Sequence, residues 1–82
     1  MNRDQLKYKI QSVFREVLDN DDLEITPEMT AEDVDGWDSI AHVQLIVALE
    51  SSFKLSFSTQ EIGDLRNIGS FISLIEQKNQ QN

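Results

Sequence analysis

A serine and a histidine lie three residues apart where a loop meets an apolar helix, and any chemistry of this chain would centre on them. Asp38 is a good N-cap residue, so we expect Ser39 to be the first helical residue, beside backbone N–H groups that lack partners within the helix. These donors and the positive end of the helix dipole favour an anion, so the position is suited to carry a phosphate. His42 follows about one turn later, and we expect it to pack against the core, with contact to a phosphate on Ser39 as the alternative.

Two other chemical interpretations of this region lack what they require. A serine–histidine nucleophile pair needs an orienting acid and an oxyanion hole within a cleft, and a chain this small has little room for them. The acidic run at 19–24 resembles a calcium loop only in its alternating acids. Such a loop needs an oxygen ligand at its fifth position, where this chain has Leu23, and a glycine at its sixth, where it has Glu24. The twelfth position needs a glutamate and is Thr30 here. We therefore expect no catalytic residue and no metal site.

The charge, length and cysteine content of the chain limit the classes of function that it can have. The chain has 82 residues, a net charge of −8 and no cysteine. The length predicts a single domain over residues 1–82, and the acidic charge argues against nucleic acid and membrane partners and for partners with basic patches. Without cysteine, any thiol must be supplied by another group. With no signal core and no long apolar run, we expect a cytoplasmic protein, monomeric unless an apolar surface pairs with its own copy.

Apolar periodicity predicts a first helix and then a long loop. The helix carries apolar residues at a helical rhythm from Leu6 to Leu18, and Asn2 with Gln5 is a plausible capping pair. Residues 19–38 contain the only proline and no sustained period, which is typical of a loop that positions the helix after it. We expect its apolar side chains to pack over the core: Leu23, Ile25, Met29 and Val34.

The second helix, expected over residues 39–53, carries two apolar groups on opposite sides. One consists of Leu45, Ile46, Leu49 and Phe53. The other, here called the apolar strip, consists of Ile40, Val43 and Val47 and begins one residue after Ser39. Because a small bundle buries one stripe, we expect the apolar strip to stay exposed as a docking surface, and the alternative is a helix buried on both sides.

A short third helix and a final helix complete the predicted fold. Ser58 and Glu61 match a capping box, which predicts a helix from there to about Leu65. Asn67 can cap the last helix, whose apolar face holds Ile68, Phe71, Ile72 and Ile75. A polar, frayed tail is expected over residues 77–82. The prediction is an all-α fold, a small four-helix bundle of three main helices and one short helix, with a long loop between helices 1 and 2.

Taken together, these features resemble the acyl carrier protein family over almost the whole chain. Residues 36–40, Gly-Trp-Asp-Ser-Ile, stand where the family has its D-S-[LI] site, and Ala48-Leu49-Glu50 with Phe53 match the end of its second helix. The resemblance implies that Ser39 bears 4′-phosphopantetheine, transferred from coenzyme A by a phosphopantetheinyl transferase, with Asp38 and His42 beside it.

The resemblance also implies a carrier and not an enzyme. Acyl groups would ride on the cofactor as thioesters and pass to an acyl-loading ligase or acyltransferase, a ketosynthase or other acyl-transferring enzymes. The family shelters acyl chains between its helices, which here implies a pocket of Leu45, Ile46, Leu49, Phe53, Phe71 and Ile75. The expected partner contacts are the apolar strip with Trp37, Glu50, Glu61 and Asp64. For Trp37 the residues themselves favour a role in anchoring the loop against the bundle, with partner contact as the second role.

One departure from the fatty-acid-synthesis members is informative. Their second helix is rich in acids, whereas here Glu50 is its only acid, so we expect more reliance on the apolar strip. The Gly-Trp-Asp-Ser-Ile stretch is more similar to discrete carriers of polyketide, other secondary-metabolite or polysaccharide-associated pathways. An aminoacyl or peptidyl carrier is one alternative. The other is a non-carrier helical adaptor that binds a partner through the apolar strip.

Overall fold

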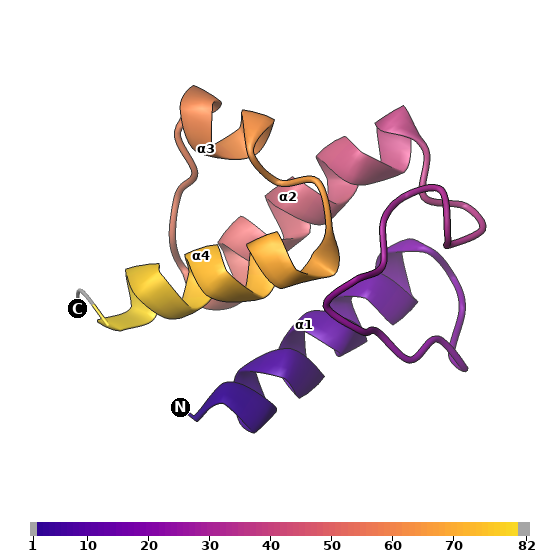
Figure 1. Cartoon of the computed structure of the whole chain (residues 1–82), viewed down its shortest axis with the longest axis horizontal. Coiled ribbons are helices and arrows are strands. Elements are labelled where there is room, and N and C mark those ends of the chain that lie inside the picture. Colours follow the sequence, from indigo (N-terminus) through magenta and orange to yellow (C-terminus); the bar gives the residue numbers. More distant parts are fainter. Residues whose placement is uncertain (1, 81–82) are drawn as a thin grey trace.

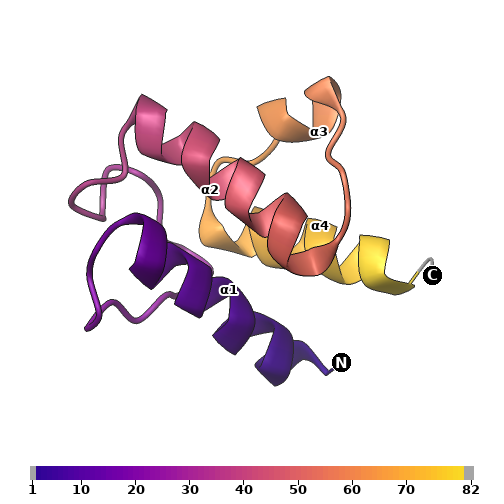
Figure 2. The same ribbon diagram turned by 180° about the vertical axis from the view of Figure 1, so that it is seen from behind.

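The computed structural model describes residues 2–80, and over this range the chain is all-helical. The elements are α1 (Arg3–Val17), α2 (Ser39–Phe53), α3 (Thr59–Gly63) and α4 (Ile68–Gln80). α1 runs opposite in direction to α2 and α4, and α3 lies on the side of the bundle away from α1 (Figures 1 and 2). The predicted four-helix bundle with a long first connection is therefore confirmed.

α1 and α3 begin where the sequence supplies a reciprocal cap. The Asn2 side chain accepts the N–H of Gln5 at 2.8 Å, and the Gln5 side chain accepts the N–H of Asn2 at 3.1 Å. Ser58 and Glu61 exchange the same pair of bonds at 3.1 and 2.8 Å. Each such cap satisfies donors that the helix leaves free and contributes about 1 kcal/mol. Both predicted capping pairs are confirmed.

One hydrophobic core lies between the three long helices and is closed over by the loop. Seven of its side chains have no exposed surface: Ile10, Phe14, Leu45, Leu49, Ile68, Phe71 and Ile75. From the loop, Leu23, Ile25 and Val34 are buried in the same core and Met29 packs against it. Full burial of a side chain of this size contributes about 1.5–3 kcal/mol, so the predicted packing of the loop both stabilises the bundle and fixes the segment before Ser39.

Polar side chains of α1 fix the start of the loop. Gln11 is buried on α1, and its side-chain oxygen accepts the N–H of Ile25 at 2.9 Å. Arg15 donates from Nε to the carbonyl of Leu23 at 2.7 Å. These bonds satisfy backbone groups that would otherwise be buried without partners, so a segment without regular structure can lie on the core.

Further along, the loop caps the last helix. The first amides of α4, those of Ile68 and Gly69, donate to the carbonyls of Met29 and Pro27, each at 2.9 Å. The absence of a side chain at Gly69 permits this approach, because a Cβ there would lie 3.1 Å from the carbonyl oxygen of Pro27. The loop is therefore held at the N-terminal end of α4 as well as on α1.

α3 is two residues shorter than its sequence pattern predicts, because it ends at Gly63 and not near Leu65. The N–H groups of Asp64 and Leu65 donate to the carbonyls of Glu61 and Ile62, three residues earlier, at 3.0 and 3.2 Å. This tight turn ends the helix and directs Leu65 inward, where it is only 3% exposed.

α4 is longer than predicted, since residues 77–80 are helical. Lys78 in this last turn forms an ion pair with the Glu61 carboxylate at 2.9 Å, and its Nζ lies 6.0 Å from the centre of the Phe57 ring. Contacts with α3 and the preceding connection thus support the end of α4. The helix therefore includes residues 77–80 of the expected frayed tail, and residues 81–82 lie outside the described part of the chain. Fraying of this segment stays a prediction.

Candidate functional site

Ser39 is the first residue of α2 and is exposed. Asp38 before it is the N-cap, as predicted: its carboxylate accepts the N–H of Ala41 at 2.8 Å, and its carbonyl accepts that of His42 at 2.8 Å. Within residues 2–80, the N–H groups of Ser39 and Ile40 have no acceptor. The Ser39 hydroxyl therefore stands at the positive end of a helix beside two free donors.

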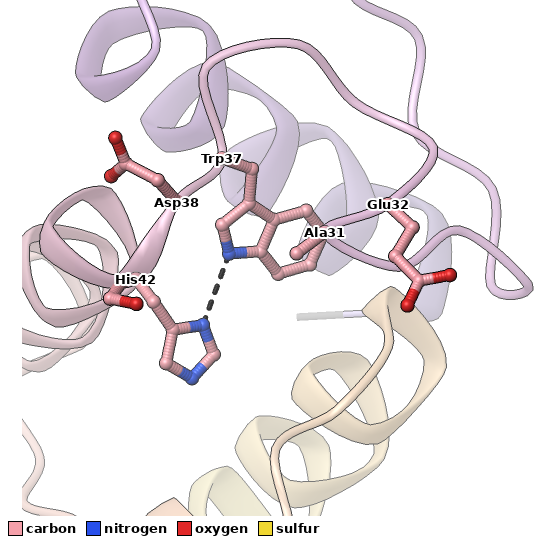
Figure 3. Close-up of a pocket in the computed structure, with 6 residues that line it drawn as sticks. Ala31, Glu32, Trp37, Asp38 and His42 are labelled. Carbon is pink, nitrogen blue, oxygen red and sulfur yellow. Dashed lines mark hydrogen bonds between the residues drawn. The ribbon is translucent and has the colours of Figure 1, made fainter.

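One cavity opens beside this hydroxyl, and a second cavity adjoins the first. The first, of about 530 Å³, is lined by Ala31, Glu32, Trp37, Asp38, Ser39 and His42. The second, of about 420 Å³, shares four of these residues and is also lined by Thr30, Leu65 and Arg66. We call the two together the Ser39 groove. It lies between the loop and the start of α2 and reaches the α3–α4 connection (Figure 3).

Trp37 anchors the loop to the core directly before Ser39. It is only 4% exposed, meets Phe14 edge-on at 5.2 Å between ring centres, and lies tilted against Phe71 at 6.2 Å. Its indole Nε1–H donates to Nδ1 of His42 at 3.0 Å (Figure 3). The structure favours the anchoring role for Trp37, because so little of its surface is available to a partner.

His42 is half-buried between Trp37 and α4. Its ring is nearly parallel to that of Trp37, with 6.0 Å between centres, and meets Phe71 edge-on at 5.8 Å, so the predicted packing is present. Burial lowers the pKa of His42 below the usual 6.5, which favours the neutral ring. Because Nδ1 accepts the Trp37 hydrogen bond, the single proton of that neutral ring is on Nε2.

Nε2 of His42 is a donor without an acceptor in the described part of the chain. It faces away from Trp37 (Figure 3), and His42 lines both cavities of the Ser39 groove. The hydrogen bond from Trp37 thus fixes both the orientation of the ring and the position of its proton. Contact between this donor and a phosphate on Ser39 stays a prediction.

The three acids expected to contact partners differ in their availability. Glu50 is half-buried and accepts a backbone N–H of the α2–α3 connection at 2.8 Å. Glu61 is held by its capping box and by Lys78. The backbone hydrogen bond from Ser58, followed by the bond from Lys78, lowers the pKa of Glu61. Asp64 is exposed. Two of the three carboxylates therefore have partners within the fold.

The apolar strip is exposed, as predicted. Ile40 is 71% exposed, and Val43 and Val47 are each 59% exposed. On the opposite side of α2, Leu45, Ile46, Leu49 and Phe53 are buried. The exposed polar side chains beside the strip, Gln44 and Ser51, are uncharged. α2 therefore presents an apolar and uncharged surface that begins next to Ser39.

The six side chains expected to line an acyl pocket form closed core packing. Leu45, Leu49, Phe71 and Ile75 have no exposed surface, so no void wide enough for water touches them. Ile46 and Phe53 are 5% and 9% exposed. An acyl chain among these side chains would require them to move apart.

Two further kinds of feature are absent from residues 2–80. No group of three or more His, Asp or Glu side chains is placed to hold a metal ion. No helix in this range is long and apolar enough to cross a membrane.

The sequence pattern did not identify the remaining walls of the groove. Ala31, Glu32, Leu65 and Arg66 come from two segments far apart in the chain, and no local spacing joins them. A usable signal was present for His42, whose position beside the buried stripe of α2 indicated partial burial. Its bond to Trp37 depends on the path of the loop, which periodicity does not describe.

Comparison with known proteins shows which family this chain resembles. The family model described as "Phosphopantetheine attachment site" matches residues 9–75. Acyl carrier proteins of Exiguobacterium sibiricum and of an Exiguobacterium sp. strain are each 28% identical, over 93% and 95% of this chain and 96% and 99% of theirs. The solution structure of a holo acyl carrier protein from Geobacter metallireducens matches with a TM-score of 0.83 and 37% identity, covering 96% of this chain and 86% of that one.

The described residues fit the cofactor that these matches imply. An exposed hydroxyl at a helix start, with two free N–H donors and an adjoining groove, can bear a phosphate-linked arm without rearrangement. Members of this family carry 4′-phosphopantetheine covalently and act as carriers, not as enzymes. By its matched residues and its fold, the chain belongs to the acyl carrier protein family.

Proposed function

We propose that this protein carries acyl groups as thioesters on a 4′-phosphopantetheine arm attached to Ser39 and delivers them to partner enzymes. The observation that carries the proposal is the exposed Ser39 hydroxyl at the start of α2, inside the matched residues 9–75 and beside a groove. Other serines near helix starts are engaged, since the hydroxyls of Ser58 and Ser70 accept backbone N–H groups there.

The chain's own residues position the arm. The Asp38 cap fixes the first turn of α2 and leaves the N–H groups of Ser39 and Ile40 without an acceptor, so these two donors would be available to a phosphate on the hydroxyl. The Nε2–H of His42 adds a third donor on the groove side. When bound, the arm supplies the thiol that the chain lacks. Tethering then replaces a free encounter with an effective concentration of the order of millimolar at the partner's active site.

Partner recognition is divided between two surfaces. The apolar strip offers contact area without charge, whereas residues 19–38 contain nine of the fifteen acids and no Lys or Arg. We infer a partner whose apolar patch meets α2 and whose basic residues meet the loop. This pattern supports a discrete carrier of a polyketide, other secondary-metabolite or polysaccharide-associated pathway, with an aminoacyl or peptidyl carrier as the second candidate.

The first test is intact mass after incubation with coenzyme A and a broad-specificity phosphopantetheinyl transferase. The wild type should gain one phosphopantetheine and Ser39→Ala none, because the Ser39 hydroxyl stands free at the start of α2 next to a groove. Ser51→Ala is the matched control, since it removes an exposed hydroxyl from the same helix and should load as the wild type does. A gain by Ser39→Ala, or none by folded wild type with several transferases, would refute the proposed site.

A further inference from the structure

Two oppositely charged side chains line the Ser39 groove without pairing with each other. The Glu32 carboxylate lines both cavities, and the Arg66 guanidinium lines the second one. Both residues are exposed, and within residues 2–80 neither side chain takes part in an ion pair. The groove therefore offers an unused acceptor and an unused donor, which come from the loop and from the connection between α3 and α4.

The remaining walls of the groove are apolar or already engaged. Ala31 is exposed and lines both cavities, and the Trp37 ring lies between the side chains of His42 and Glu32 in the view of Figure 3. The Asp38 carboxylate is occupied by the cap of α2. A strongly charged ligand of either sign would meet a like charge here, because Glu32 and Arg66 line the same cavity. An uncharged ligand with amide groups and small apolar groups would find partners for all of them.

The arm of 4′-phosphopantetheine has this chemistry beyond its phosphate. It is uncharged there and carries two amides, a hydroxyl and a pair of geminal methyl groups. Its fixed end would be at Ser39, which lines the first cavity, so the arm starts at the groove itself. The cavities, of about 530 and 420 Å³, fall in the range of roughly 300–1,000 Å³ that is usual for small-molecule sites.

We propose that the Ser39 groove is a resting site for the arm, in which Glu32 accepts from N–H or O–H groups of the arm and Arg66 donates to its carbonyl oxygens. The inference rests on the proposed attachment of the cofactor at Ser39. None of the three residues of the apolar strip lines the groove. Between transfers, the arm therefore lies against the loop and leaves the strip free for a partner.

Tethering makes weak contacts sufficient for such a site. A tethered group has an effective concentration of the order of millimolar at a site within its reach. A groove that binds the free arm with a dissociation constant of about 1 mM is therefore about half occupied by the tethered arm. Solvent screens the exposed groups of the groove, so the arm also leaves it readily. A resting site of this strength does not hinder delivery to a partner enzyme.

The first test is NMR of isotope-labelled protein loaded from unlabelled coenzyme A. Nuclear Overhauser effects between the unlabelled arm and the labelled chain identify the residues that the arm contacts. We expect the geminal methyl groups to contact Ala31, and the amide hydrogens of the arm to exchange at least about twofold more slowly than those of free 4′-phosphopantetheine. Contacts with Ile40 and Val43 in place of the groove, or no contact with the chain, would overturn the proposal.

A pair of acid variants tests the assignment of Glu32. Glu32→Ala removes the acceptor, so the amide exchange of the arm should return to within about 20% of the rate in free 4′-phosphopantetheine. Glu28→Ala is the matched control, because it removes an exposed acid of the same loop that lines neither cavity. Both side chains are exposed, so both variants should fold, and their melting temperatures check this. Equal effects of the two substitutions, or no effect of Glu32→Ala, would contradict the assigned role.

Intact mass is measured before each spectrum, so failure of attachment at Ser39 is seen separately as no mass gain. In that case the groove is tested in the unloaded chain with free 4′-phosphopantetheine at about 10 mM, roughly ten times the effective concentration of a tethered arm. Shifts of the backbone amide signals of Ala31 and Arg66 that Glu32→Ala reduces and Glu28→Ala does not would support the site. No shift of these signals in the wild type would overturn it.

Discussion

At the scale of residues, a single hydrogen bond between Trp37 and His42 joins the loop to α2 and the core. Only a neutral imidazole can accept it, because a ring protonated at Nδ1 would place two N–H donors 3.0 Å apart. Burial of the ring lowers the pKa of His42 and so keeps the acceptor in place at neutral pH. The orientation of the Nε2–H donor in the Ser39 groove therefore depends on the protonation state of His42 itself.

Stability should fall as the pH is lowered from 6.5. With the folded pKa of His42 below 6.5, the unfolded chain takes up its proton first, so acid favours unfolding until the folded pKa is passed. The expected loss is under about 1 kcal/mol, because a half-buried ring is partly screened by solvent. Urea unfolding at pH 7.5 and 5.5 measures it, and His42→Gln should show a smaller change. Titration of the single histidine by NMR at 6.5 or above would contradict this prediction.

At the scale of elements, the two opposite faces of α2 have different functions. Its buried stripe packs into the core, and the apolar strip, with residues 59% to 71% exposed, meets solvent beside Ser39. A helix that serves only the bundle gains nothing from an exposed strip of this kind, and polar residues would keep it from self-association. The strip is therefore expected to bind partners.

Val43→Glu should slow phosphopantetheine loading without weakening the fold. Val43 is 59% exposed, so the folded state loses little packing, but a carboxylate placed against an apolar patch is desolvated on docking. The expected loss in kcat/KM for the transferase is about tenfold, equivalent to about 1.4 kcal/mol. Ser51→Glu adds the same charge at the other end of α2 and should load almost normally. Equal effects of the two substitutions would indicate a response to net charge and not to the strip.

Local sequence chemistry was sufficient to place the helix starts. Asn2, Asp38 and Ser58 each precede an apolar periodic segment and carry a side chain that accepts an N–H three residues later. The bounds of α2 and the exposure of its apolar strip also followed from periodicity alone. These features depend on neighbours within one or two turns, which is the range over which a sequence pattern has physical meaning.

Long-range contacts account for what the sequence pattern missed. The last turn of α4 is held by the ion pair between Lys78 and Glu61, two residues that no periodicity relates. The orientation of His42 is set by Trp37 across the junction of loop and helix. Four aromatic rings, those of Phe14, Trp37, His42 and Phe71, meet from α1, the loop, α2 and α4, and no local spacing joins them. The acyl pocket between the helices stays a prediction.

The acidic charge is distributed unevenly over the whole molecule. Residues 19–38 contain nine acids and no Lys or Arg of their own, and this loop leads directly into Ser39. The N-terminus of α1 and the C-terminal end of α4 lie at the other end of the bundle (Figures 1 and 2). The loop acids therefore place most of the negative charge at the Ser39 end of the bundle, where it can steer a basic partner before contact.

Removal of two loop acids should slow transferase loading at low salt. Glu28→Gln with Asp35→Asn reduces the local charge, and the expected fall in kcat/KM is about two- to fivefold at low ionic strength. The difference should disappear near 0.5 M salt, where screening acts over roughly 4 Å. Asp4→Asn with Glu76→Gln removes the same charge near the chain ends and is the control. Equal slowing by both pairs would show that only net charge matters.

The hydrogen bonds between the loop and α4 offer a way to measure whether the loop stays attached to α4. The first amides of a helix ordinarily exchange freely with solvent, but those of Ile68 and Gly69 are bonded to the carbonyls of Met29 and Pro27. Their hydrogen–deuterium exchange therefore measures how often the loop detaches from α4. Slow exchange of these two amides while a partner enzyme engages Ser39 would mean that cargo is passed with the loop in place. Fast exchange would mean that the loop lifts at each transfer.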